Sequence, residues 1–265
     1  MQLGIIVRWV NPVMKQVIEL LRGQGYYVEL INPDSTRFDL TNIRVEHDLY
    51  IIKSGTDAAF TLAGMLHALG ANTLNPYPIV AQIRNKLIST TLLQKKGVPT
   101  PETYMVSDMN DLSPLLEDGP LILKPYCGSR GEGVNIVNHS NELDHLIYPR
   151  PILAQRYYKP DLAGMDHKVF CIDGQLFGIL RRWPLPSYEH KKGEPFTLSK
   201  ELEHIAYQVG KIFDIRLYGM DIIISAGKPY VVDVNKFSSF MGVPNGPQLI
   251  ADYIHQEFMR LILEK

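Results

Sequence analysis

The sequence has little of what marks several classes of protein. Its 265 residues include only two cysteines, Cys127 and Cys171, in no metal-type spacing, so we expect neither a disulfide framework nor a zinc site. The 27 basic and 28 acidic residues leave a net charge of -1, which gives no support to a nucleic-acid or membrane-surface partner. No apolar run approaches the roughly 18 residues that span a bilayer. The first residues, MQLGIIVRWVNP, lack a secretory cleavage pattern, so we expect a cytoplasmic protein.

The composition that remains is that of a globular protein. Hydrophobic residues make up 45% and charged residues 21%, and the length predicts two or three compact lobes. Strands and helices alternate in the first part of the chain, which favours an open α/β sheet. The first strand is not followed by G-x-G-x-x-G, so no dinucleotide site is predicted. The expected strands are 3–7, 26–31 and 49–52, and the expected helices are 13–21 and 57–69.

Apolar periodicity predicts the elements of the remaining chain. A long helix over 79–96 ends at Gly97, and prolines then mark the entry to a second lobe. The apolar stripe of the last helix is typical of packing on a sheet. The expected strands are 121–124, 134–137, 152–157, 168–172, 176–181, 219–224 and 230–234, and the expected helices are a short one after Ser140, 199–213 and 245–264.

The most informative segment is GMDIIISAGKPYVVDVN, residues 219–235. It reads as two strands joined by a tight turn. If Ser225 faces Pro229 in this hairpin, Asp221 lies directly opposite Asp233. Two carboxylates about 5 Å apart at an effective dielectric near 20 repel each other by roughly 3 kcal/mol. The pattern therefore predicts a cation at this position.

The amide of Asn235 shares a strand face with Asp233, because strand side chains alternate. Two carboxylates and an amide form the hard-oxygen set that suits Mg²⁺ together with phosphate oxygens. The alternative is a pair of strand-end aspartates that form salt bridges with lysine or arginine. Both interpretations fit the triplet when it is taken alone.

A glycine-rich loop lies in LILKPYCGSRGEGV, residues 121–134. A strand ends at Lys124, and Gly128, Gly131 and Gly133 follow before the next strand. Glycines let a backbone turn its N–H groups toward a phosphate, and a lysine supplies a point charge. The spacing excludes G-x-x-x-x-G-K-[ST], the P-loop. A plain hairpin between two strands is the alternative.

Charged residues also stand at the ends of the strands in residues 152–182. Asp166 and Lys168 open one strand, while Arg181 and Arg182 close the next. A lone Arg-Arg pair is usually a solvated strand end. The order of lysine, glycine-rich loop, acid, arginine and Asp/Asp/Asn is harder to explain in that way.

In this order the motifs resemble the ATP-grasp superfamily, and within it the RimK-type carboxylate–amine ligases, from about residue 50 to residue 255. The resemblance implies an α/β fold in which lobes clamp ATP: an N-terminal open α/β domain over 1–83, a central lid over 84–157 and a C-terminal lobe over 158–265. It implies ATP and Mg²⁺ as cofactors, with Mn²⁺ as an alternative. The implied ATP-binding residues are Lys86, Lys124, Gly128, Ser129, Arg130, Gly131, Gly133, Val134, Gln155, Arg156, Tyr157, Asp166 and Lys168; the metal ligands are Asp221, Asp233 and Asn235; the catalytic residues are Arg181, Arg182 and Lys124.

Two positions depart from the RimK type, which usually has Glu in place of Asp233 and an acidic residue in place of Arg156. The stretches VVDVNKFSSFMGVP, HKVFCIDG and IIKSGTD, the last around Lys53, are instead similar to inositol polyphosphate kinases of the ITPK type, which share the fold. The leading hypothesis is a ligase that joins a carboxylate to an amine through an acylphosphate.

A small-molecule kinase and a non-catalytic nucleotide-binding subunit are the alternatives. A kinase acting on a polyol phosphate needs a cationic pocket, for which Lys53, His190, Lys191 and Lys192 are candidates. The 183–196 loop is a candidate cover for the substrate. The sequence leaves open the acceptor, a small molecule or a peptide, and whether the chain forms a homo-oligomer.

Overall fold

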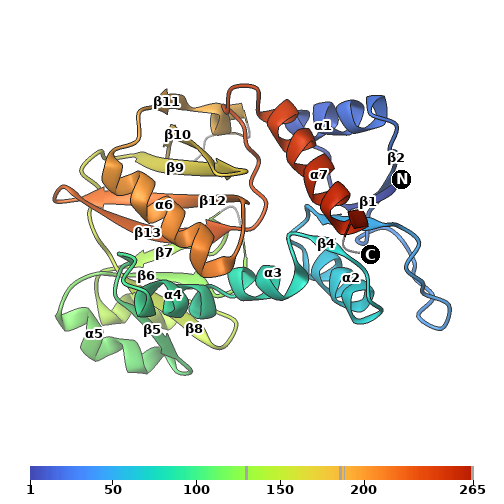
Figure 1. Cartoon of the computed structure of the whole chain (residues 1–265). Helices are drawn as coiled ribbons and strands as arrows, with labels where there is room; N and C mark the ends of the chain where they lie inside the picture. The colour runs from blue at the N-terminus through green and yellow to red at the C-terminus, as the bar shows by residue number, and fades with distance from the viewer. Residues whose placement is uncertain (129–130, 185–186, 188, 264–265) are drawn as a thin grey trace.

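The computed structural model describes residues 1–128, 131–184, 187 and 189–263. Its strands form three sheets, and helices cover their faces (Figure 1). Among the described residues, no helix is both long and apolar enough to cross a membrane. Each sheet draws its strands from one stretch of the chain, whereas the last helix returns to the first sheet.

The first sheet is parallel, with the order β2-β1-β3-β4. This confirms the open α/β sheet predicted from the alternating elements. Asn11 caps the first helix, because its Oδ1 accepts a hydrogen bond of 2.8 Å from the N–H of Met14, and Pro12 fits the first helical position. The elements are β1 (Gln2–Ile6), α1 (Pro12–Gly23), β2 (Tyr27–Ile31), β3 (Leu49–Ile52), α2 (Asp57–Ala68) and β4 (Thr73–Leu74).

The single helix expected over 79–96 is wrong, because two helices occupy this stretch: α3 (Tyr77–Arg84) and α4 (Lys86–Lys95). Asn85 separates them, and its Oδ1 accepts the N–H groups of Leu87 and Ile88 at 3.1 and 3.3 Å. Asparagine competes with the helical backbone for hydrogen bonds and therefore favours a cap over a helix interior. As a result Lys86 becomes the first residue of α4.

The second sheet is antiparallel, with the order β5-β8-β6-β7. Its core includes Leu112, Leu121, Leu123, Val137 and Ala154. The edge strand β5 and helix α5 were not expected from the sequence, because both are too short to show a clear period. The elements are β5 (Thr103–Val106), η1 (Met109–Leu112), α5 (Ser113–Glu117), β6 (Leu121–Pro125), β7 (Asn135–Val137), η2 (Ser140–His145) and β8 (Ile152–Arg156).

The third sheet is antiparallel, with the order β11-β10-β9-β12-β13. Helix α6 covers one face, where Phe213 shares a core with Val169 and Met220. The 183–196 loop contains a helical turn and a short strand within its described residues. The elements are β9 (Met165–Ile172), β10 (Gln175–Arg182), η3 (Glu189–Lys192), β11 (Glu194–Phe196), α6 (Lys200–Phe213), β12 (Leu217–Ser225), β13 (Lys228–Asn235) and α7 (Gly246–Leu263).

Helix α7 lies beside α1 and joins the first and third sheets into one core (Figure 1). The ring of Phe258 meets Tyr26 edge-on at a centroid distance of 5.1 Å. Ile254 belongs to the same cluster as Phe170 on β9 and Leu3 on β1. The last helix therefore packs both on a sheet, as its stripe predicts, and on another helix.

The β12–β13 hairpin turns through Ala226 and Gly227, whose φ angles of +49° and +73° suit a two-residue hairpin turn. This turn pairs Ser225 with Lys228 rather than with Pro229, so the register expected next to the turn is wrong.

A bulge after Asp221 then shifts the register by one residue. Beyond the bulge Asp221 pairs with Asp233, as the sequence predicts, and Gly219 pairs with Asn235. The two irregularities together leave both carboxylates on one face of the sheet.

Candidate functional site

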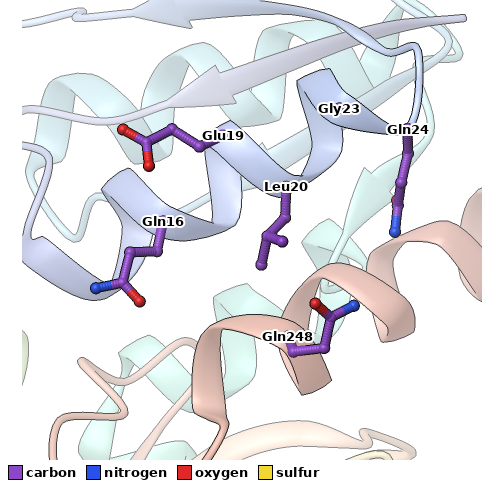
Figure 2. Close-up of a pocket in the computed structure, with 6 residues that line it drawn as sticks. All are labelled: Gln16, Glu19, Leu20, Gly23, Gln24 and Gln248. Carbon is purple, nitrogen blue, oxygen red and sulfur yellow. The ribbon is translucent and has the colours of Figure 1, made fainter.

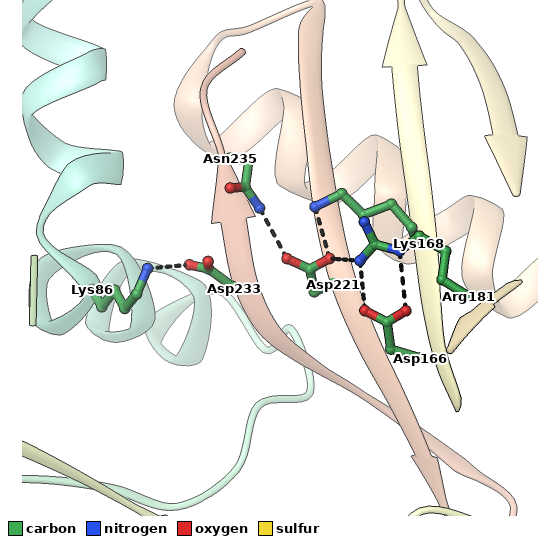
Figure 3. Close-up of polar contacts among 7 residues, drawn as sticks. All are labelled: Lys86, Asp166, Lys168, Arg181, Asp221, Asp233 and Asn235. Carbon is green, nitrogen blue, oxygen red and sulfur yellow. Dashed lines mark hydrogen bonds and ion pairs between the residues drawn. The ribbon is translucent and has the colours of Figure 1, made fainter. Parts of the chain in front are cut away.

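Asp221 is the centre of a polar network on one face of the third sheet (Figure 3). Its Oδ1 lies 2.7 Å from Lys168 Nζ and 2.9 Å from Arg181 Nη2, while Asn235 Nδ2 donates to its Oδ2 at 3.0 Å. Burial alone raises the pKa of the Asp221 carboxyl, but the positive charges of Lys168 and Arg181 outweigh burial and lower it. Asp221 is therefore held as a carboxylate.

Arg181 joins Asp221 to a second buried acid, Asp166. The guanidinium donates to Asp166 through Nε at 3.1 Å and Nη2 at 2.5 Å, a bidentate pair between cross-strand neighbours. Burial raises the pKa of Asp166 despite the hydrogen bonds from Arg181. Arg182 is exposed, because the next side chain on a strand points to the other face. The structure thus brings Arg181 into the network and leaves Arg182 in solvent.

Two further lysines approach the paired carboxylates from other elements. Lys86, at the start of α4, places Nζ 2.8 Å from Asp233 Oδ1. Lys124, on β6, is buried and donates to the backbone oxygen of Val232 at 2.9 Å. Burial lowers the pKa of Lys124 to about 8, although Asp233 opposes this shift. Three lysines from three elements therefore surround the two aspartates.

The oxygen set of Asp221, Asp233 and Asn235 fits a hard divalent cation shared with phosphate. Within the described parts of the chain, no group of three or more His, Cys, Asp or Glu side chains could hold a metal, and here the third oxygen comes from an amide. Carboxylate and amide oxygens suit Mg²⁺, which takes its remaining ligands from water and phosphate. The structure fits both interpretations of the triplet. The two aspartates lie together, as a metal site requires, and they also form salt bridges with Lys86 and Lys168.

The glycine-rich loop between β6 and β7 needs glycine for its conformation. Gly131 and Gly133 have φ angles of +73° and +70°, in the left-handed region that other residues rarely adopt. Tyr148 closes the loop, since its hydroxyl donates to the oxygen of Gly133 at 2.7 Å. Trp183 packs on Gly131, where an added methyl group would lie 2.5 Å from the Trp183 Cη2. The start of the 183–196 loop thus covers the glycine-rich loop.

The remaining nucleotide-binding candidates lie at several places. Ser129 and Arg130 fall outside the described residues, and Val134 is exposed at the end of the loop. Gln155 is buried, and its Nε2 donates to Thr103 Oγ1 at 2.9 Å. Neither Val134 nor Gln155 joins the network around Asp221 through a described hydrogen bond.

Arg156 has a structural position. Its Nη1 donates to the backbone oxygens of Leu115 and Gly119 at 2.9 and 2.6 Å, at the end of α5. The N–H of the next residue, Tyr157, donates to the oxygen of Pro120 at 2.9 Å. The Arg156 side chain therefore stabilises the turn after α5, which explains how a base is accommodated where the RimK-type ligases that the sequence resembles usually carry an acid.

A family model described as the RimK-like ATP-grasp domain matches residues 83–245. The chain belongs to the RimK-like ATP-grasp family. This range contains every residue of the network around Asp221.

Curated relatives of this RimK-like chain are named as ligases. It is 24% identical to a probable alpha-L-glutamate ligase of Thioalkalivibrio sulfidiphilus, over 86% of this chain and 85% of that protein. It is 28% identical to the coenzyme gamma-F420-2:alpha-L-glutamate ligase of Methanococcus maripaludis, over 84% of this chain and 85% of that protein. The prediction of an ATP-dependent enzyme that ligates a carboxylate and an amine is confirmed by this membership.

Solved structures confirm the ATP-grasp fold. The RimK domain protein of Sphaerobacter thermophilus superposes with a TM-score of 0.77 at 17% identity, over 96% of this chain and 99% of that one. The ATP-grasp ligase PsnB, complexed with a minimal precursor, Mg and ADP, gives a TM-score of 0.67 at 17% identity, over 96% of each chain. At this level of identity the likeness concerns the fold.

The candidate residues for the cationic pocket of a kinase are partly brought together. Lys53, directly after β3, donates from Nζ to the backbone oxygens of Phe237 and Ser238 at 3.2 and 2.5 Å. Burial, followed by the charges of Lys191 and Lys236, lowers the pKa of Lys53 to about 7. His190 and Lys192 are exposed, and His190 Nδ1 lies 2.9 Å from a serine hydroxyl of its own loop.

Two basic residues near this pocket, Arg84 and Lys236, were missed from the sequence. Position was a signal for both, since Lys236 directly follows Asn235 and Arg84 stands two residues before Lys86, and Lys236 also lies in the stretch VVDVNKFSSFMGVP that resembles inositol polyphosphate kinases.

A surface hollow between α1 and α7 lies apart from these residues (Figure 2). Neither helix contributes a side chain to the network around Asp221. Glutamine side chains predominate there, so the hollow offers no pair of reactive groups. The residues that line it are Gln16, Glu19, Leu20, Gly23, Gln24 and Gln248.

Proposed function

We propose that this RimK-like ligase activates a carboxylate with the γ-phosphate of ATP and passes the acyl group to an amine of an amino acid or a peptide. The observation that supports this most directly is the pair Asp221 and Asp233, enclosed by Lys86, Lys124 and Lys168. The two aspartates and three lysines of this patch nearly balance in charge. The aspartates can therefore bind a cation while the lysines bind the phosphates, with little change in the net charge of the site. We also propose the domain boundaries 1–83, 84–157 and 158–265, each of which contains one sheet.

Lys86 and Lys124 are proposed to hold the α- and β-phosphates. In the structure Lys86 is paired with Asp233, and Lys124 with a backbone oxygen. Phosphate oxygens are stronger partners for an ammonium than a neutral carbonyl is. Nucleotide binding therefore exchanges partners that already exist and exposes no unpaired lysine. The N–H groups of the glycine-rich loop face the same phosphates in this proposal.

Asp221, Asp233 and Asn235 would hold Mg²⁺, or Mn²⁺, which would neutralise charge on the transferred phosphoryl group. The solved PsnB complex with Mg and ADP, which has the same fold, supports Mg²⁺ as the metal. Arg181 acts as a positioning residue, since it donates hydrogen bonds to both Asp166 and Asp221 and so fixes the two carboxylates relative to each other. Arg182 is no longer needed for the phosphoryl transfer in this scheme.

The reaction balances without a covalent enzyme intermediate. A carboxylate oxygen of the first substrate attacks the γ-phosphorus, the bond to the β-phosphate oxygen breaks, and ADP leaves. The amine then attacks the acyl carbon, loses a proton and expels phosphate to give the amide. Positioning and charge neutralisation supply the catalysis. Burial raises the pKa of the Cys127 thiol near the loop, which disfavours a thiolate nucleophile.

Hydroxylamine trapping tests the proposal, because hydroxylamine can replace the amine substrate. With ATP, Mg²⁺ and a pool of amino-acid and peptide carboxylates, we expect hydroxamate formation in step with ADP. The Asp233→Asn variant should lose this activity, and Arg182→Met should retain it. If phosphorylated polyols stimulate ADP formation without hydroxamate or free phosphate, the protein is a kinase and the ligase proposal is wrong.

A further inference from the structure

Three basic side chains meet next to the proposed phosphate site but take no part in it. Lys53 directly follows β3, Arg84 ends α3, and Lys236 directly follows β13. They come from segments far apart in the sequence, so the fold itself gathers their charges. The aromatic rings of Phe60 and Phe237 lie among them. We call these five residues the cationic pocket.

The amine of Lys236 is buried and has no hydrogen-bond partner among the described residues. It lies 5.9 Å from the ring centroid of Phe60, and the Arg84 guanidinium lies 4.7 Å from the same centroid. Arg84 Nε is likewise buried without a partner in the described part of the chain. Buried polar groups are normally hydrogen-bonded, so two unpartnered N–H donors around one ring are unusual.

The acid that compensates Arg84 lies at the surface. Asp57 pairs with Arg84 Nη2, yet the Asp57 side chain is 92% exposed. Lys53 Nζ donates hydrogen bonds to the backbone oxygens of Phe237 and Ser238 and lies 4.5 Å from the Phe237 ring centroid. Its lowered pKa reflects burial first and then the neighbouring lysines. Burial likewise lowers the pKa of Lys236 to about 8. With both amines protonated, the three basic side chains carry more positive charge than the paired Asp57 compensates.

The position of the cationic pocket connects it to the reaction. Lys236 directly follows the proposed metal ligand Asn235, and Arg84 precedes the phosphate-binding Lys86 by two residues. The same two chain segments thus contribute residues both to the phosphate site and to the cationic pocket. A group bound in the pocket would lie beside the γ-phosphate end of the nucleotide, where the substrates must react.

We propose that Lys53, Arg84 and Lys236 bind an anionic group, carboxylate or phosphate, of a substrate whose other end reacts at the γ-phosphate. The inference rests on the proposed function. It narrows the substrates to molecules with an anionic group besides the one that reacts, such as an acidic amino acid, an acidic peptide end or a phosphorylated compound. The two aromatic rings shield the ion pairs from water and so strengthen them.

Calorimetric titration of the full chain, saturated with Mg²⁺ and a non-hydrolysable ATP analogue, tests this inference. The probes are L-glutamate against L-glutamine and O-phospho-L-serine against L-serine. We expect at least one anionic probe to bind about tenfold or more tightly than its neutral counterpart, as charged hydrogen bonds allow. Glutamate and phosphoserine distinguish carboxylate from phosphate. Equal binding or non-binding of charged and neutral probes would overturn the inference.

Variants separate this inference from the proposed function. Lys236→Gln should lower the affinity for the anionic probe about tenfold, while Lys211→Gln, at an exposed position, should change this affinity less than twofold. Both should bind the ATP analogue as the wild type does. If the analogue fails to bind the wild type, the proposed nucleotide site fails rather than the pocket.

Thermal melting adds a readout that does not depend on the probe. An unpartnered buried amine contributes no stability, so Lys236→Gln should melt at the wild-type temperature or higher. A clearly lower melting temperature would show that a partner within the protein satisfies Lys236, and would contradict the inference.

Discussion

Arg181→Met and Arg182→Met remove the same charge from adjacent positions, and the structure predicts very different results. Arg181 is buried and pairs with Asp166 and Asp221 at 2.5 and 2.9 Å, while Arg182 is exposed. Removing one partner of a buried ion pair costs about 3–5 kcal/mol, because the other charge stays buried without compensation. Surface substitutions usually change stability by no more than about 0.5 kcal/mol.

Urea unfolding at pH 8 without nucleotide measures both variants against the wild type. We expect Arg181→Met to lose about 3 kcal/mol of unfolding free energy, since Lys168 still compensates Asp221 in part. We expect Arg182→Met to remain within about 0.5 kcal/mol. Adding Asp166→Asn to Arg181→Met should recover part of the loss, because it removes the carboxylate that was left unpaired.

The stability loss of Arg181→Met should depend on pH in a defined direction. Burial already raises the pKa of Asp166, and loss of Arg181 removes the group that opposes this shift. Between the unfolded and folded pKa values the folded state binds more protons, so the variant gains stability relative to the unfolded chain as the pH falls. The loss should therefore be smaller at pH 5 than at pH 8. Equal losses for Arg181→Met and Arg182→Met would refute the buried network.

Three further predictions concern the nucleotide. The pKa of Lys124 is about 8, so affinity for an ATP analogue should fall as the pH rises through 8, and Lys124→Arg should flatten that profile; an unchanged profile would contradict the role of Lys124. Gly131→Ala should weaken ATP binding several-fold because it displaces Trp183, whereas Gly174→Ala, with a similar positive φ but open space around it, should not; equal effects would exclude the contact. Mg²⁺ should tighten ATP binding to the wild type but not to Asp233→Asn, and an equal Mg²⁺ effect in both would remove the metal assignment.

The pairing of Asp221 with Asp233 was predictable because strand side chains alternate and tight turns set the register. The prediction needed two errors to cancel. The turn pairs Ser225 with Lys228, and the bulge after Asp221 restores the register, a local feature that no alternation reveals. Lys86 was found from the family motif, but its position at a helix start depends on Asn85, whose capping role competes with a continuous apolar stripe.

The cationic pocket could not be predicted, since its members belong to three separate segments and none of them has a motif. Lys53 and Lys236 lie in stretches that resemble inositol polyphosphate kinases, but only Lys53 was a candidate for an anion site. Contacts between residues so far apart depend on how the first and third sheets pack, which a period of two or 3.6 residues does not encode. Strand alternation does place Arg181 and Arg182 on opposite faces, but it does not tell which face the rest of the molecule covers.

The most direct test of a carboxylate–amine ligase compares free phosphate with ADP while the protein turns over Mg-ATP. Carboxylates with amino acids form one acceptor pool, and phosphorylated polyols form the other. We predict acceptor-dependent phosphate release equal to ADP with the first pool, because each acylphosphate is consumed by an amine. Acceptor-dependent ADP without free phosphate, obtained with the second pool, would mean that the phosphoryl group stays on the product and would contradict ligation.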